Sequence, residues 1–172
     1  DSGIGILFIV RGPKGFTGGK AVDGLASHID VIPTICDVAG IDTPSRCEGV
    51  SLRPLAAGEV DSVREEIHAE VNYHACYEPM RCVRTDRYKY IKRFSDRTEP
   101  VLPNCDQSLS KDLAMEAGWW PIEDEMLFDT ILDPGETRNL VGNLEGADVL
   151  ADMRGRLQRW QESTNDPILD GP

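Results

Sequence analysis

The feature that most constrains the fold is a stretch of alternating side chains around one turn, residues 80–94, which read MRCVRTDRYKYIKRF. The turn falls at residues 85–87, and it leaves Tyr88 and Tyr90 on one face of the second run and Ile91 on the other. Two aromatic and β-branched runs separated by a short polar turn are typical of a β-hairpin. An antiparallel sheet is therefore expected in the second half of the chain.

Other segments predict the remaining elements. Residues 5–13, GILFIVRGP, are apolar without alternation, as in a buried strand of a parallel sheet. Residues 125–129, EMLFD, predict a further short strand. Residues 147–164 predict a closing helix whose apolar side chains fall on one stripe: Val149, Leu150, Met153, Leu157 and Trp160. Strands and helices alternate first and a small sheet follows, so we expect an α/β fold with an antiparallel appendage.

A second helix is predicted at residues 27–40, SHIDVIPTICDVAG. Asp30 suits its N-cap and Gly40 the position after its last turn. Its expected apolar stripe is Ile32, Ile35, Cys36 and Ala39. Residues 95–124 show little periodicity and predict a long excursion, which we expect Trp119 and Trp120 to anchor to the body.

Composition limits the partners that the chain is expected to have. The formal net charge of the 172 residues is −12, opposite in sign to that of proteins whose main partner is a nucleic acid. The apolar run near the start is far too short to span a bilayer. The five cysteines have irregular spacing and no C-x-x-C pair, which predicts neither a disulfide framework nor a structural zinc site.

Two groups of polar residues are candidates for chemistry. Asp129, Asp133 and Glu136 surround a Pro-Gly turn, where carboxylates bind backbone N–H groups more often than a metal. The irregular segment of residues 70–81 holds Glu70, His74 and Arg81, a set that suits a polar anionic ligand but is also compatible with a plain surface loop. No complete catalytic constellation and no metal-ligand set is present, so neither a catalytic nor a metal residue is assigned.

Five phrases together, in one order, resemble the C-terminal third of sulfatases of the alkaline-phosphatase superfamily. They are SHIDVIPTICDVAGI, GVSLRPLAAGE, MRCVRTDRYKYI, EMLFDTILDPGETRNL and LQRWQESTNDPILDG. The last phrase, with YEPMRCVR, is most similar to the heparan N-sulfatase (sulfamidase) branch. The sulfatase nucleophile motif is Cys-x-Pro-x-Arg or Ser-x-Pro-x-Arg. In this chain Cys76 and Pro79 are separated by two residues rather than one, so Cys76 does not match it.

The resemblance implies that residues 1–60 end a sulfatase α/β core and residues 61–172 form its C-terminal subdomain: the end of an alkaline-phosphatase-like sheet, then a small antiparallel sheet with a C-terminal helix. It implies a sulfated saccharide substrate whose site Glu70, His74, Tyr77 and Arg81 line. Calcium and formylglycine are implied for the parent enzyme, held by residues upstream of this chain. Self-association, or pairing with the N-terminal region, is expected. Family members are mostly periplasmic, secreted or lysosomal.

Three readings follow from the sequence. The chain is part of a hydrolase of sulfate esters or sulfamates, part of a phosphoester or phosphonate hydrolase of the same superfamily, or a non-catalytic saccharide-binding or structural protein. The nucleophile motif upstream discriminates the first two. The third requires saccharide binding without turnover.

Overall fold

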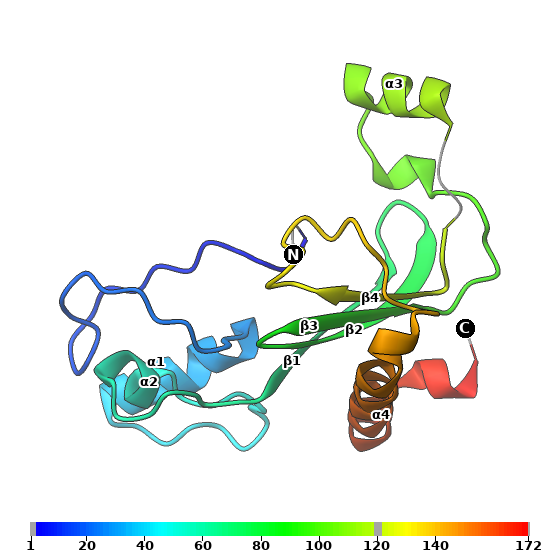
Figure 1. Ribbon diagram of the computed structural model, residues 1–172. Helices are drawn as coiled ribbons and strands as arrows, with labels where there is room; N and C mark the ends of the chain where they lie inside the picture. The colour runs from blue at the N-terminus through cyan, green and yellow to red at the C-terminus, as the bar shows by residue number, and fades with distance from the viewer. Residues whose placement is uncertain (1–2, 119–121, 172) are drawn as a thin grey trace. The chain divides into compact units, whose positions relative to one another are not determined.

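A computed structural model describes residues 3–118 and 122–171, which divide into two compact units (Figure 1). Unit 1 comprises Asp1–Ile67 and unit 2 comprises His68–Pro172. Within the described residues, no helix has the length and apolar character needed to cross a membrane.

Unit 1 contains two helices after a long irregular segment. The elements are the 3₁₀ turn η1 (His28–Asp30), α1 (Val31–Ala39) and α2 (Arg53–Ala57). Gly40 ends α1 with φ of 74°, as the sequence predicted, because glycine adopts the left-handed conformation without a Cβ clash. Of the expected apolar stripe of α1, Cys36 is buried as predicted, but Ile32, Ile35 and Ala39 are exposed. The other buried residues of the helix are Pro33 and Thr34, so most of the predicted stripe is wrong.

The strand predicted at residues 5–13 is also wrong for this chain. The segment has no strand geometry, and Leu7 and Ile9 are 87% and 80% exposed. An apolar run becomes a buried strand only where neighbouring strands satisfy its backbone and helices cover its faces. Neither condition is met within the described part of unit 1.

The buried carboxylate of Asp30 organises unit 1. Asp30 is fully buried, and its side chain accepts hydrogen bonds from the backbone N–H of Ser27 (2.8 Å) and of Val50 (2.9 Å) and pairs with Arg64. Gly49 lies in the connector between α1 and α2 and allows it to approach the backbone of Ile29. A Cβ at this position would lie 2.0 Å from the carbonyl oxygen of Ile29. Helix α1 is thereby fixed to the connector that follows it.

Unit 2 is built on a four-stranded sheet in the order β1-β2-β3-β4. The strands are β1 (Glu66–Tyr73), β2 (Tyr77–Thr85), β3 (Tyr88–Arg93) and β4 (Glu125–Asp129). β3 pairs antiparallel with both β2 and β4, which brings Val83, Tyr90 and Leu127 side by side. The predicted hairpin and the predicted strand at residues 125–129 are confirmed.

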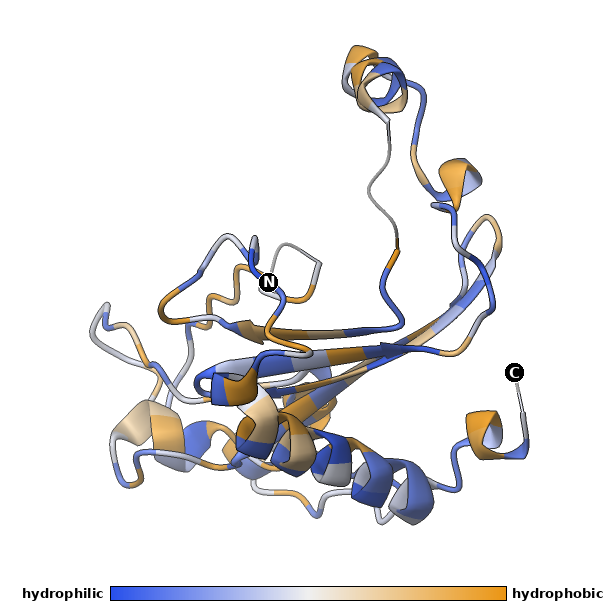
Figure 2. Cartoon of the chain, turned by 45° about the vertical axis from the view of Figure 1, so that its right-hand side comes forward, coloured by the Kyte–Doolittle hydropathy of each residue, from blue (hydrophilic) through white to orange (hydrophobic). Residues whose placement is uncertain are grey.

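Helix α4 (Ala147–Thr164) packs on one face of this sheet, as Figures 1 and 2 show. Its buried side chains Leu150, Met153 and Leu157 meet the row of Val83, Tyr90 and Leu127 to form the core, with the partly buried Val149 and Trp160 beside them. The apolar stripe predicted for residues 147–164 is therefore confirmed. The 3₁₀ turns η3 (Leu144–Gly146) and η4 (Pro167–Asp170) precede and follow the helix.

The excursion between β3 and β4 carries elements that the sequence did not predict. It contains the 3₁₀ turn η2 (Leu102–Asn104) and helix α3 (Leu109–Ala117), which stands away from the sheet in both views (Figures 1 and 2). Leu109 and Leu113 of α3 are exposed. The anchoring role predicted for Trp119 and Trp120 falls outside the described residues.

Candidate functional site

Residues 74–76 connect β1 to β2 and form one end of the sheet (Figure 1). Glu70 lies on β1, His74 lies in the connection and Tyr77 begins β2, and all three residues are exposed. Tyr73, which the sequence analysis did not single out, is exposed beside them. This end of unit 2 therefore presents an acid, an imidazole and two phenol rings to solvent.

Arg81, the fourth predicted residue, is buried beneath this surface. Its Nε and Nη2 donate to the two carboxylate oxygens of Asp166 at 2.7 and 2.8 Å, and its Nη1 donates to Oδ1 of Asn72 at 2.8 Å. The hydrogen bond from Arg81 lowers the pKa of Asp166 to about 2. A bidentate, charge-assisted pair of this kind is among the stronger polar contacts in proteins.

The guanidinium of Arg81 links the exposed residues to the body of unit 2. Its Nε lies 3.4 Å from a carboxylate oxygen of Glu70. Asp166, through its hydrogen bond, contributes most to raising the pKa of Arg81, and the charges of Glu70 and Tyr77 contribute less. The structure therefore brings Glu70 and Arg81 together and places Tyr77 within electrostatic reach of Arg81, with His74 in the adjoining loop.

Two residues that shape this region were missed by sequence reasoning. Asp166 is 85 positions from Arg81, and no local pattern connects them. Asn104 lies in the excursion, yet its side-chain oxygen accepts from the backbone N–H of Ala75 (2.8 Å) and of Cys76 (3.0 Å). A signal for Asn104 would have required knowing which loop lies against the β1–β2 connection.

The acidic turn after β4 has the backbone-binding role that the sequence predicted. Asp129 accepts hydrogen bonds from the backbone N–H groups of the second and third residues after it. Asp133 accepts from the backbone N–H of Arg138 at 2.8 Å, which lowers the pKa of its carboxyl. Glu136 forms an ion pair with the buried side chain of Lys89. These carboxylates are engaged by the fold itself rather than gathered around a common point.

The side chains that could ligate a metal lie apart from one another. Across residues 3–118 and 122–171, no three His, Cys, Asp or Glu side chains come together in a group that could hold a metal ion. The donor set that a calcium ion needs, six to eight oxygens, is therefore not assembled by these residues.

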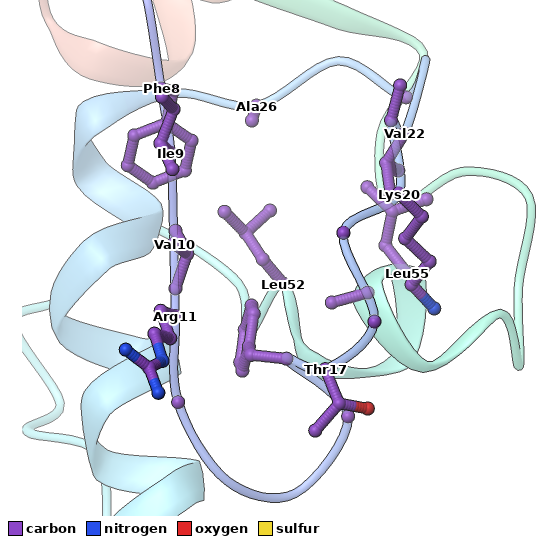
Figure 3. Close-up of a pocket in the computed structure, with 18 residues that line it drawn as sticks. Phe8, Ile9, Val10, Arg11, Thr17, Lys20, Val22, Ala26, Leu52 and Leu55 are labelled. Atoms are coloured by element: carbon purple, nitrogen blue, oxygen red, sulfur yellow. The ribbon is translucent and has the colours of Figure 1, made fainter.

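Unit 1 contains a separate apolar hollow of about 890 Å³. Figure 3 shows the segment from Phe8 to Arg11 on one side, Thr17 and Lys20 on the other, and Leu52 between them. The lining is mostly apolar side chain and glycine backbone, without a convergent set of polar groups.

Comparison with known proteins identifies a consistent set of relatives. The family model described as "N-sulphoglucosamine sulphohydrolase, C-terminal" matches residues 1–107. A Delta 4,5-hexuronate-2-O-sulfatase of Bacteroides thetaiotaomicron is 30% identical over 173 residues, which cover 96% of this chain and 30% of the relative. An Ulvan-active sulfatase of Formosa agariphila is 27% identical over 177 residues, covering 99% of this chain and 35% of the relative.

Solved structures agree with these relatives. The structure described as a 2-O GAG sulfatase matches 94% of this chain and 30% of its own, with a TM-score of 0.69 and 28% identity. The chain therefore spans about a third of the length of the proteins it matches. The predicted end of an alkaline-phosphatase-like fold with a small antiparallel sheet and a C-terminal helix is confirmed.

Proposed function

The chain belongs to the N-sulphoglucosamine sulphohydrolase C-terminal family of sulfatases, within the alkaline-phosphatase superfamily, and on that premise we propose that it supplies the saccharide-recognition part of a hydrolase of sulfated sugars. The bond cleaved is a sulfate ester or a sulfamate. The main observation in support of this proposal is the exposed group of Glu70, His74 and Tyr77 at one end of the unit 2 sheet.

Each exposed residue has a role that suits a sulfated sugar. Tyr77 offers an aromatic face and a hydroxyl, a combination that packs on the apolar face of a sugar ring and bonds its edge. Glu70 accepts hydrogen bonds from sugar hydroxyls, and His74 donates a hydrogen bond to sulfate oxygens. Arg81 acts from beneath, because it is buried and holds the Glu70 carboxylate rather than presenting its own charge.

The relatives' names support a sulfated saccharide as the ligand class. They describe proteins that act on a 2-O-sulfated hexuronate, on ulvan and on N-sulphoglucosamine. The net charge of −12 gives no general attraction for polyanions, so recognition rests on the local geometry of the β1–β2 end.

The calcium ion and the formylglycine nucleophile of the parent enzyme are proposed to belong to the region that precedes this chain in its relatives. The described carboxylates do not assemble a calcium site, and Cys76 lacks the nucleophile spacing. We expect the purified 172-residue chain to leave an aryl sulfate uncleaved, with or without added calcium. Calcium-dependent turnover above background would refute the proposal that the nucleophile and the calcium ligands lie outside these 172 residues.

The same preceding region is the proposed partner of unit 1. The apolar hollow and the exposed run at residues 6–10 offer a surface that further strands would cover. Expressed without that region, the chain is expected to self-associate through the same surface.

Saccharide binding is tested by titrating the chain with N-sulphoglucosamine and with a 2-O-sulfated glycosaminoglycan disaccharide, followed by NMR. Wild type is expected to bind at least one probe, and Tyr77→Ala and His74→Ala are expected to weaken it about tenfold each, a loss of about 1.4 kcal/mol. His28→Ala is the matched control, an exposed histidine in unit 1. Equal binding by all four proteins, or none by wild type, would refute the site.

A further inference from the structure

The side chain of Asn104 reaches from the excursion to the proposed saccharide site. Its Oδ1 accepts from the backbone N–H of Ala75 at 2.8 Å and of Cys76 at 3.0 Å. Its Nδ2 donates to Oε2 of Glu78 at 3.0 Å. Both ends of one amide are therefore used to hold the connection between β1 and β2.

The contact continues into the sheet. The second carboxylate oxygen of Glu78 lies 3.4 Å from Nη2 of Arg93, whose side chain is 2% exposed on β3. The backbone N–H of Phe94 donates to the carbonyl oxygen of Pro79 at 3.0 Å. Asn104 is thereby tied through Glu78 to a buried residue of the adjacent strand as well as to the surface loop.

On its other side, Asn104 is supported by helix α3. Nζ of Lys111 donates to the carbonyl oxygens of Leu102 (3.0 Å) and of Cys105 (2.9 Å), the residues that flank Asn104 in and just after η2. The helix starts with a true cap, in which Ser108 Oγ accepts from the backbone N–H of Lys111. Although α3 stands away from the sheet, its first turn therefore closes the turn that carries Asn104.

The bonds to Ala75 and Cys76 fix the residues between His74 and Tyr77. The local constraint on this loop is weaker, a hydrogen bond of 3.3 Å from the backbone N–H of His74 to the carbonyl oxygen of Cys76. A loop that samples several conformations binds with an affinity reduced by the fraction of time it spends in the competent one. Fixing the backbone therefore prepares both side chains for a ligand.

We propose that Asn104 is a positioning residue for saccharide recognition, and that the described residues 95–118 of the excursion set the conformation of residues 74–77 through it. The inference rests on the proposed saccharide site. It goes beyond that site by assigning a function to a segment whose described residues lie outside the cluster of Val83, Tyr90 and Leu127 under helix α4.

The test measures separately how rigid the β1–β2 connection is and how tightly the saccharide binds. In Asn104→Ala, hydrogen exchange at the amides of Ala75 and Cys76 is expected to accelerate at least tenfold, while the amides of β3 keep their protection. Affinity for the saccharide that wild type binds is expected to fall about tenfold, as when the competent loop is populated one-tenth of the time. Asn143→Ala is the control, since its Oδ1 also accepts from a backbone N–H, that of Glu145.

A rescue variant distinguishes positioning from general destabilisation. The carboxylate introduced by Asn104→Asp still accepts from two backbone N–H groups but repels Glu78. Adding Glu78→Gln removes the repulsion and restores a hydrogen bond with reversed polarity. The double variant is expected to recover both slow exchange and affinity to within about threefold of wild type, whereas Asn104→Asp alone recovers neither.

Each result has a distinct meaning. Unchanged hydrogen exchange at Ala75 and Cys76 in Asn104→Ala would show that Asn104 does not fix the backbone of the β1–β2 connection. Faster exchange with unchanged affinity would overturn the positioning role while leaving the saccharide site intact. Absence of saccharide binding by wild type would refute the proposed function, and this inference with it.

Discussion

At the scale of single residues, local roles could be predicted from the sequence and distant partners could not. Asp129 and Asp133 were expected to bind backbone N–H groups around their turn, and they do. Arg81 was expected to reach a ligand, but its charge is neutralised inside the protein by Asp166. The role of the two aspartates depends on neighbours a few positions away in the sequence. The role of Arg81 depends on Asp166, which is 85 positions away.

The Arg81–Asp166 pair makes Asp166→Asn strongly destabilising. Both side chains are 2% exposed, and removing one charge leaves the other buried without its partner. The free energy of unfolding is expected to fall by about 3–5 kcal/mol. Urea denaturation checks this, with Asp152→Asn as control, because the Arg156–Asp152 pair is solvent-exposed and worth about 0.5 kcal/mol or less. Equal losses of unfolding free energy in the two variants would contradict the conclusion that the buried Arg81–Asp166 pair stabilises the fold.

The same pair predicts a pH dependence of stability. The hydrogen bond from Arg81 lowers the pKa of Asp166 from 3.8 to about 2 in the folded chain. A lowered folded-state pKa contributes stability that is complete above the unfolded value and is lost as pH falls towards 2. The contribution is about 2 kcal/mol. Unfolding free energies at pH 5 and pH 2.5 should therefore differ more in wild type than in Asp166→Asn, and parallel curves would disprove the linkage.

Gly49 is required by contact rather than by backbone conformation. A Cβ there would lie 2.0 Å from the carbonyl oxygen of Ile29, and backbone cannot move aside as a flexible side chain does. Gly49→Ala is therefore expected to destabilise unit 1 by about 3 kcal/mol. Gly12→Ala is the control, since its Cβ would sit at an ordinary 3.9 Å from Phe16. Thermal unfolding of both variants makes the comparison, and similar midpoints would count against the contact.

At the scale of elements, periodic segments were predicted and context-dependent ones were not. The hairpin of β2 and β3, strand β4 and helix α4 carry their own patterns of alternation or apolar stripe, and each is confirmed. The run at residues 5–13 carries no such internal pattern, so its state depends on neighbours. Helix α3 was not predicted, and none of its residues is buried.

Asn139 joins the turn after β4 to the sheet. Its Oδ1 accepts from the backbone N–H of Leu127 (2.8 Å) and of Val141 (3.1 Å), and its Nδ2 donates to the carbonyl oxygen of Glu125 (2.9 Å). Asn139→Ala leaves the N–H of Val141 and two backbone groups of the edge strand β4 without this partner, and it is expected to cost about 2–3 kcal/mol. Asn143→Ala, which loses one cap bond, should cost about 1 kcal/mol. Chemical denaturation that ranks the two variants in reverse would refute this role.

At the scale of the whole molecule, the chain resembles part of a larger core more than a finished one. Unit 2 has a helix-covered sheet, while unit 1 exposes Leu7, Ile9 and other apolar side chains around its hollow. Residues 5–13 have the apolar composition expected of a buried strand, yet they are mostly exposed and lie outside any strand. The relatives are about three times as long as this chain, which supports the proposal that a further region covers this surface.

The exposed run at residues 6–10 therefore predicts concentration-dependent self-association of the isolated chain. Contiguous apolar patches on a soluble protein drive association, and a charge at their centre opposes it. Leu7→Asp with Ile9→Asp is expected to shift the chain towards monomer in sedimentation velocity, with the core of unit 2 unchanged. Leu144→Asp is the control, because Leu144 is 93% exposed but belongs to unit 2 rather than to the run. Wild type that stays monomeric at high concentration, or association that persists in the double variant, would show that this surface is not the one that recruits further chain.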